Sequence, residues 1–319
     1  MTALSGGAEL PLAAAEQDPS DRIEGRSPWQ LAWIRLRSDR VAIISGVFVV
    51  LLVAVALAAP LLSHLIGWGP ADQDRDQGLS AAGLPMGPSA RHLLGTDNLG
   101  RDVLIRVIYG TRVSLLVGVA ATGLSIVMGV VVGLAAGYFG ALVDSLLSRF
   151  MDVVLSFPFL LFAIALVSIY GSSLTLTVFV IAFFSWAAVG RIVRGQTLSI
   201  REKEYVEAAR SLGAGDMRIM FVDVLPNLLA PVIVYATLLI PIAIVFEATL
   251  SFLGLGVVPP TPTWGNMLND ALPFYQVSWW FALFPGLALL LTTLAFNLLG
   301  DGVRDALDPR TERLFAEQE

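Results

Sequence analysis

Long uninterrupted apolar runs dominate this 319-residue chain, and most charged side chains lie between them. A helix that crosses the hydrocarbon core of a membrane needs about 20 mainly apolar residues. Six stretches reach that length and predict six transmembrane helices: Val41–Leu62, Val113–Phe139, Met151–Tyr170, Ser172–Val193, Leu228–Leu250 and Trp279–Leu299. The pattern therefore predicts an all-α polytopic membrane protein.

The composition supports a lipid-facing surface and excludes several kinds of site. Hydrophobic residues make up 56% of the chain and charged residues only 14%, whereas a soluble domain carries about 25% charged residues. The absence of cysteine excludes disulfides, thiolate metal sites and cysteine nucleophiles. The two histidines, His64 and His92, are far apart, so we expect no metal site. The sequence has no basic stripe, which argues against nucleic acid as a partner.

Positive charges assign the two sides of the membrane, because arginine and lysine accumulate in cytoplasmic loops. They gather in the N-terminal tail, in the C-terminal tail and after the fourth predicted helix, at Arg191, Arg194, Arg201, Lys203, Arg210 and Arg218. Both termini and the 195–226 loop are therefore predicted to be cytoplasmic. The long first loop also carries arginines and is the one discordant segment.

The same reasoning divides the chain into three parts. Residues 1–27 are polar and acidic, which predicts a disordered cytoplasmic tail without a signal peptide. Residues 28–111 carry the first transmembrane helix and an extracellular loop. Residues 112–319 form a core with the other five helices and the cytoplasmic loop.

Local patterns predict three further features. Gly129, Gly133 and Gly137 are spaced by four residues in the second predicted helix, which favours close helix packing over a gating role. The stretch Leu99–Tyr109 predicts an amphipathic helix at the membrane interface, with an ion pair between its residues Asp102 and Arg106. A second ion pair is expected between Arg149 and Asp152.

The cytoplasmic loop predicts a helix–turn–helix. Glu202–Leu212 has the composition of a short helix, with one side formed by Tyr205, Ala208, Ala209 and Leu212. Gly213 is suited to the left-handed conformation that ends a helix, Asp216 to the N-cap of a second helix, and Pro226 to its end. The pattern alone fits either a docking surface for another protein or a connector that packs on its own bundle.

The residues of this loop resemble a known family. Glu207-Ala208-Ala209 followed by Gly213 resembles the EAA loop of permease subunits of bacterial ABC importers, and Leu225-Pro226-Asn227 resembles the peptide-transporter branch. In that family the loop forms a coupling helix that sits in a cleft of the ATP-hydrolysing subunit. The resemblance implies that the ATPase contact is made by Glu207, Ala208, Ala209 and Gly213, together with Tyr205 and Leu212. Asp223 departs from the family, which usually has a basic residue there.

Two more stretches resemble the oligopeptide, dipeptide and nickel branch. They are His92–Asp102 before the second helix, and Glu247–Gly256 with Pro260–Gly265 after the fifth. The resemblance implies a type I ABC importer permease in the bacterial plasma (inner) membrane, forming half of a translocation pathway for peptides. It also implies a second homologous permease, two cytoplasmic ATPase subunits and an extracellular solute-binding protein. Dipeptide, longer peptide and nickel remain open as substrates.

This chain is not expected to be an enzyme. Its only lysine, Lys203, does not lie in the Gly-x-x-x-x-Gly-Lys-Ser/Thr pattern that holds nucleotide phosphates. We therefore expect no cofactor on the chain, with ATP and magnesium bound by the partner ATPase subunits. Glu247 is either a pore-lining carboxylate in the translocation path or, by preference, a hydrogen-bond partner for the turn after it. Asn297 is likewise either an interhelical hydrogen-bond partner or part of the path.

Two other functions are less well supported. A stand-alone secondary transporter usually shows internal repeats and ionisable residues at the membrane midplane, and we find no convincing repeat. An intramembrane enzyme would need a motif such as a Gly-x-Ser-x-Gly elbow or a zinc-binding helix, and neither is present.

Overall fold

The computed structural model describes residues 28–308, so the predicted tail at 1–27 lies outside the described residues. Within them the fold is helical, and strand pairing is limited to isolated bridges. Five continuous helices are long and apolar enough to cross a membrane by length and composition: α2 (Arg40–Ile66), α3 (Val103–Phe139), α6 (Leu174–Arg201), the run Asp216–Phe252 and α11 (Trp279–Leu307). That run consists of α8 (Asp216–Arg218), a π-helix (Ile219–Val224) and α9 (Leu225–Phe252).

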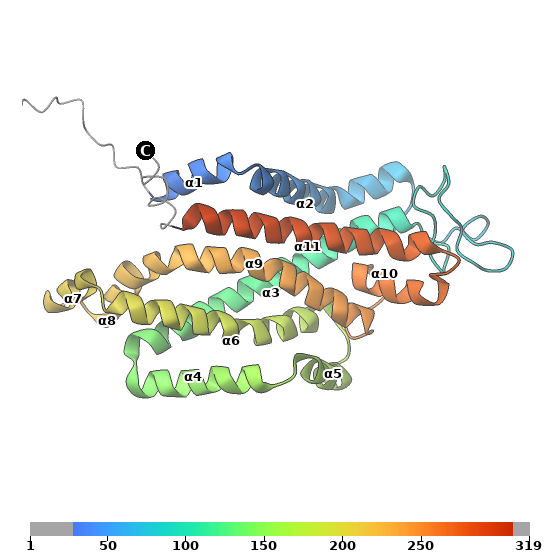
Figure 1. The fold of residues 1–319 in the computed structure, drawn as a ribbon. Coiled ribbons are helices and arrows are strands. Elements are labelled where there is room, and N and C mark those ends of the chain that lie inside the picture. Colours follow the sequence, from blue (N-terminus) through green and yellow to red (C-terminus); the bar gives the residue numbers. More distant parts are fainter. Residues whose placement is uncertain (1–27, 309–319) are drawn as a thin grey trace, which may run out of the picture.

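The third predicted span is not one straight helix. It is divided into α4 (Ala141–Ser156) and α5 (Phe159–Tyr170), which are bent by 82° relative to each other. The break follows from Pro158, because a residue before proline is disfavoured in the α conformation. Phe157 is accordingly extended, with φ −77° and ψ 133°. If α4 and α5 are counted together as one bent span, the total number of membrane crossings is six. Figure 1 shows α5 turned across the end of α4.

The remaining elements are short helices at the two ends of the bundle. They are α1 (Pro28–Ser38), α7 (Glu204–Ser211), α10 (Trp264–Ala271) and a 3-10 helix (Leu272–Phe274). The start of α1, the end of α11 and α7 lie at one end of the bundle, and the loop before α3 lies with α10 at the other (Figure 1). Arg35 Nη1 donates to the carbonyl of Asp308 at 3.0 Å, so the two ends of the described chain meet. That this end is cytoplasmic remains a prediction.

The predicted interfacial helix at Leu99–Tyr109 is wrong. Its second half is the beginning of α3, which runs without a break for 37 residues. Asp102 is the N-cap of this helix and accepts from a backbone amide in its first turn. The predicted pair of Asp102 with Arg106 is also wrong, because Arg106 Nε lies 3.2 Å from Asp97 Oδ2 instead.

The other predicted ion pair is replaced by pairs between helices. Asp152 of α4 pairs with Arg191 of α6, not with Arg149. Arg194 lies about one helical turn after Arg191 on α6, and its Nη2 donates to Asp144 Oδ2 of α4 at 2.7 Å. Both pairs join α4 to α6, and a contact between two helices cannot be found from spacing within one of them.

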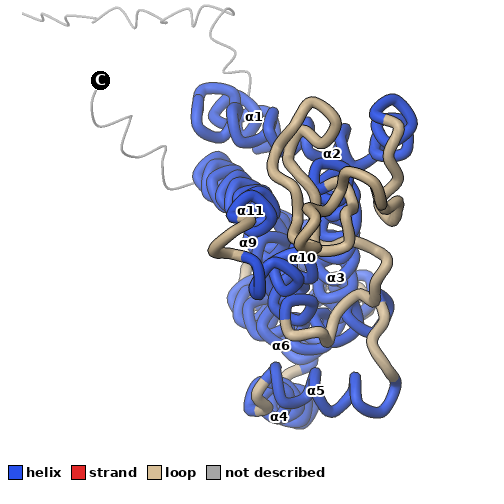
Figure 2. Tube along the Cα trace, turned by 90° about the vertical axis from the view of Figure 1, so that its right-hand side faces the viewer, coloured by secondary structure: helices blue, strands red, loops and turns tan. Residues whose placement is uncertain are grey.

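Close contact between α3 and α6 forms the centre of the bundle (Figure 2). A Cβ atom on Gly133 would lie 2.5 Å from the carbonyl oxygen of Gly190, and one on Gly129 would lie 2.5 Å from Val189 Cβ. Gly137 is equally close to Thr197 of α6. The glycines therefore let the two backbones approach closely, which confirms the predicted packing role.

Replacing Gly133 with alanine should destabilise the protein. Alanine favours a helix over glycine by about 1 kcal/mol, but here its methyl group would overlap backbone atoms of α6, and overpacking costs about 1–3 kcal/mol. Gly123→Ala is the matched control, because nothing lies within 4 Å of its added Cβ. Thermal unfolding in detergent should show a lower midpoint for Gly133→Ala and an unchanged or higher one for Gly123→Ala. Equal midpoints would contradict the packing role.

Candidate functional site

The segment between α6 and α9 contains the short helix α7 at the end of the bundle. Lys203 precedes it in an extended conformation, and Gly213 follows it with φ +80°. The predicted left-handed residue at Gly213 is confirmed, and no atom would lie within 4 Å of an added Cβ. Glycine is needed here for its backbone conformation and not for lack of space.

The two faces of α7 have different surroundings. Val206 is fully buried beneath the helix. Tyr205, Ala208 and Leu212 point outward, and Leu212 is 88% exposed. Ala209 is half-buried against the core, so the predicted four-residue face is divided between the two sides. One face of α7 thus packs on the bundle, as a connector would, and the other is open. That the open face docks on another protein remains a prediction.

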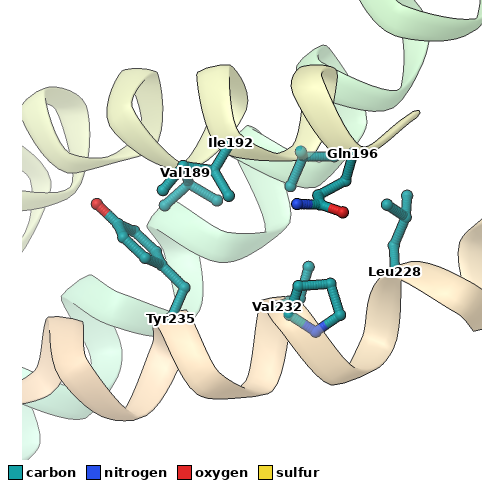
Figure 3. Close-up of a pocket in the computed structure, with 8 residues that line it drawn as sticks. Val189, Ile192, Gln196, Leu228, Val232 and Tyr235 are labelled. Atoms are coloured by element: carbon teal, nitrogen blue, oxygen red, sulfur yellow. The ribbon is translucent and has the colours of Figure 1, made fainter. Parts of the chain in front are cut away.

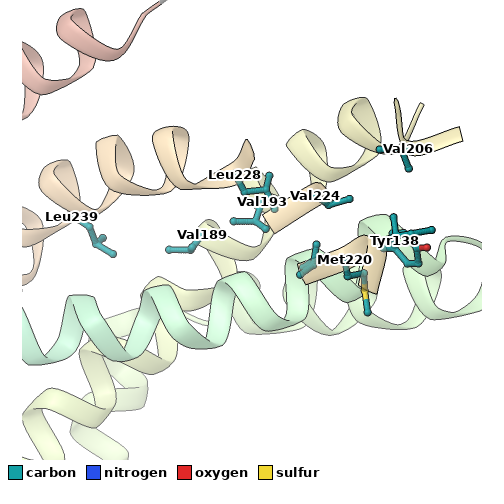
Figure 4. Close-up of a cluster of buried hydrophobic side chains, with 10 residues drawn as sticks. Tyr138, Val189, Val193, Val206, Met220, Val224, Leu228 and Leu239 are labelled. Carbon is teal, nitrogen blue, oxygen red and sulfur yellow. The ribbon is translucent and has the colours of Figure 1, made fainter. Parts of the chain in front are cut away.

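A buried apolar cluster lies under α7 (Figure 4). It joins α7 to α3, α6, the π-helix and α9 through Leu134, Tyr138, Val189, Val193, Val206, Ile219, Met220, Val224, Leu228 and Leu239. Burial of Val206 against this cluster fixes the position of α7, because removing an aliphatic side chain from water contributes about 1.5–3 kcal/mol. The exposed face of α7 is therefore held on a packed base.

Two predictions for the end of this segment are wrong. Gly215, not Asp216, is the N-cap of α8, and the Asp216 carboxylate accepts a hydrogen bond from Tyr138 Oη at 2.8 Å. Pro226 does not end a helix; it lies in the first turn of α9. Proline removes one backbone hydrogen bond from a continuous helix, and here it closely follows the turn that is a π-helix. The chain enters α9 through the π-helix without a break in the run.

The space between α6 and α9 near this cluster is too small for a ligand. The cavity has a volume of about 10 Å³ and is lined by Val189, Ile192, Val193, Gln196, Leu228, Pro231, Val232 and Tyr235 (Figure 3). That volume is about one water molecule. This space between α6 and α9 is therefore not a small-molecule pocket.

Glu247 is enclosed near the other end of α9. Its side chain is fully buried, and its two carboxylate oxygens accept from Ser114 Oγ of α3 and Ser251 Oγ, each at 2.7 Å. The Ser251 hydroxyl also accepts from the amide of Val257 at 3.4 Å. This arrangement favours the interpretation of Glu247 as a hydrogen-bond partner of the turn. Asn297, by contrast, is exposed on α11.

The loop before α3 is held by a buried histidine between two carboxylates. His92 Nδ1 lies 2.8 Å from Asp102 Oδ2, and His92 Nε2 lies 3.2 Å from Asp74 Oδ2. Both ring nitrogens can donate at once only in the imidazolium form. Arg91 pairs with Asp74 at 2.7 Å and covers the ring of Trp68. Burial opposes ionisation of Asp74, but hydrogen bonds from backbone amides and His92, with the Arg91 charge, lower its pKa.

A second buried ionic group joins this loop to α10. Arg101 Nε donates to Asp97 Oδ2 at 2.6 Å, and Arg101 and Arg106 both approach Asp270 of α10, at 3.6 and 3.9 Å. Burial raises the pKa of Asp270 despite the two nearby arginines. The charged residues of the loop before α3 are therefore engaged mainly in ion pairs and hydrogen bonds within the protein.

Comparisons with known proteins identify the family. Residues 129–313 match the model of the binding-protein-dependent transport system inner membrane component. Residues 27–82 match the N-terminal TM domain of oligopeptide transport permease C. The chain belongs to the peptide branch of the ABC importer permeases. With its five to six apolar spans, the permease is a multi-pass protein of the bacterial inner membrane.

Curated relatives cover nearly the whole permease. The dipeptide transport system permease protein DppC of Alkalihalophilus pseudofirmus is 42% identical over 92% of this chain and 93% of its own. The glutathione transport system permease protein GsiD of Pectobacterium atrosepticum is 43% identical over 89% of this chain and 92% of its own. The di/tripeptide transport system permease protein DppC of Pseudomonas aeruginosa is 44% identical over 93% and 96%.

A solved structure shows the same fold. The inward-facing MetNI methionine ABC transporter contains a chain that matches the permease with a TM-score of 0.52 at 17% identity. The match covers 65% of this chain and 96% of that chain. The permease therefore has the ABC importer permease fold, as the resemblance implied.

Sequence reasoning missed the contacts that fasten the permease at its two ends. The stretch His92–Asp102 was singled out only for its resemblance, and its partner Asp74 lies 18 residues from His92 with no periodic signal. The partners Tyr138 and Asp216 are 78 residues apart. Neither contact leaves a local pattern, because folding alone brings the segments together.

Replacing Asp74 with asparagine should weaken the loop before α3 at neutral pH. A carboxylate whose pKa is lowered by folding contributes stability above its ordinary value of 3.8, and that contribution is lost as the pH falls through the folded value. The unfolding midpoint of Asp74→Asn should thus lie below that of wild type at pH 7, with the difference shrinking in acid. Exposed Asp76→Asn is the control. A pH-independent difference would exclude this ionic role.

Variants of Glu247 separate its two interpretations. Glu247→Ala leaves two buried serine hydroxyls without their acceptor and should cost about 1–3 kcal/mol of stability. Glu247→Gln keeps polar atoms at both positions and should retain most of the stability and transport. Thermal unfolding and solute uptake measure the two effects. A stable Glu247→Gln protein without transport would show that the charge acts in the translocation path.

Proposed function

We propose that the permease forms half of the translocation pathway of an ATP-driven peptide importer and is coupled to cytoplasmic ATPase subunits through residues 202–218. The observation that carries this proposal is the open face of α7. Leu212 is 88% exposed and Tyr205 is 46% exposed, while Val206 on the opposite side is fully buried. Exposed apolar side chains on a firmly packed helix are typical of a contact surface for another protein.

The residues of this face suit a helix that enters a cleft. Ala208 is small, so a partner can approach the backbone of α7 closely. Glu207 is exposed next to it and offers a carboxylate at the rim. The turn at Gly213 sends the chain back toward α8, so that α7 projects as the tip of the segment. Glu207, Ala208, Gly213, Tyr205 and Leu212 would contact the ATPase, with Ala209 supporting them from the packed side.

The mechanism follows from the two connections of α7. It is joined through a short turn to α6 and through α8 and the π-helix to α9. Closure of the ATPases on ATP would displace α7 and, with it, the spans, from an inward-open to an outward-open state. Such coupling requires two states of the bundle with different affinity for the nucleotide-bound ATPases. ATP and magnesium would be bound by those subunits, and this chain would not be catalytic.

The other partners are assigned by analogy with the named relatives. Dipeptide and di/tripeptide permeases among them support peptides as the substrate class. A second homologous permease would complete the pathway, and an extracellular solute-binding protein would approach the end with α10. Asn297 would lie on the pathway or face the second permease, since its side chain is exposed on α11. Family membership argues against the secondary transporter and the intramembrane enzyme.

Purification of the tagged permease in mild detergent tests this proposal. A second permease and P-loop ATPases should co-purify, and Glu207→Arg should lose the ATPases by reversing the charge at the contact. Gly213→Ala should weaken their binding, because an L residue in the left-handed region costs about 1–2 kcal/mol. Gly195→Ala in α6 is the control, since it has neither a positive φ nor a neighbour within 4 Å of the added Cβ. Recovery of the permease alone would refute the importer assignment.

A further inference from the structure

The last turn of α3 is tied to the proposed coupling segment by a hydrogen bond. Tyr138 Oη donates to Asp216 Oδ1 at 2.8 Å. The Tyr138 ring is 6% exposed and belongs to the apolar cluster under α7, close to Met220 (Figure 4). The hydroxyl group of Tyr138 reaches Asp216, the first residue of α8, and also contacts the side chain of Arg210 in α7.

A second bond ties the same turn of α3 to the other side of α7. Arg201, the last residue of α6, donates from Nη1 to the carbonyl of Gly137 at 2.9 Å. The chain therefore contacts α3 both before and after α7. Neither α6 nor α8 is adjacent to α3 in sequence, so these contacts connect α7 to a span that it does not join covalently.

A polar cavity lies between the Tyr138 and Arg201 side chains that make these two hydrogen bonds. Its volume is about 360 Å³, and it is lined by Tyr138, Phe139, Arg201, Glu202, Glu207 and Arg210. A cavity of this size holds several water molecules. The hydrogen bond from Tyr138 thus lies where the apolar cluster ends and a hydrated space begins.

We propose that Tyr138 is a positioning residue whose bond to Asp216 makes α3 move together with the coupling segment. This inference rests on the proposed function of α7. The span α3 packs against α2, α6 and α9, so its movement determines whether the bundle changes state as a unit. The covalent path from α7 to α9 passes through the π-helix, whereas the Tyr138 bond acts on α3 directly.

Spin labels can test the bond, because the chain contains no cysteine. Leu142, in the first turn of α4 directly after α3, and Met217 in α8 are 72% and 65% exposed, which makes both suitable for labelling after substitution by cysteine. In the assembled complex with wild-type Tyr138, the distance between the labels should be the same without nucleotide and with ATP trapped by vanadate. In Tyr138→Phe and in Asp216→Ala the distance should shift or broaden in the trapped state.

The same variants should lower the uptake of a labelled dipeptide per ATP hydrolysed. A roughly five- to tenfold loss is expected for a hydrogen bond to a charged group that contributes to coupling between sites. The double variant should be no worse than Tyr138→Phe alone, because that variant already removes the contact of the hydroxyl with Asp216. Tyr235→Phe, which removes a hydroxyl from a half-buried tyrosine of α9, is the matched control and should behave as wild type.

The outcomes separate this inference from the proposed function. Unchanged label distances and unchanged uptake per ATP in both single variants, with ATPases still bound, would overturn the role of Tyr138 alone. Additive losses in the double variant would also overturn it. Failure of the wild-type permease to bind ATPases would refute the proposed function itself and this inference with it.

Discussion

The close approach of α3 and α6 is the contact on which the rest of the permease depends. Three glycines on α3 let its backbone meet α6 where a methyl group would overlap. In lipid there is little hydrophobic force between helices, so such packing is a main source of association. This contact places the last turn of α3 beneath α7 and the first turn beside α10. Both ends of the bundle are thus assembled around one helix.

The two ends are built from different interactions. Around the start of α3, buried ion pairs and the His92 contacts hold a long loop in one shape. Buried charges of this kind favour a single arrangement, because any alternative leaves a charge without a partner. Around α7 the contacts are mostly apolar, with one exposed face and a polar cavity beside it. The first end is suited to a fixed platform, and the second to a segment that moves against a partner.

The polar groups inside the bundle are mostly used for structure. Glu247 lies at membrane depth, where ionisable residues are usually functional. Here its oxygens hold two serine side chains of α3 and α9. The consequence is a fixed turn after α9, from which the chain continues to α10. Both oxygens of this buried carboxylate are thus engaged by hydroxyl groups of the protein itself.

The sequence by itself determined the class of protein, its apolar membrane-spanning stretches and the position of the short helix α7. Apolar length and the special backbone of Gly213 are local properties, so they can be recognised without a fold. The tertiary structure decided the rest: the bend at Pro158, the start of α3 at Val103, and the partners of Asp102, Asp152 and Asp216. Each of those depends on which segments lie next to one another. Spacing within one helix cannot show that an arginine of α6 or a tyrosine 78 residues away is the nearer partner.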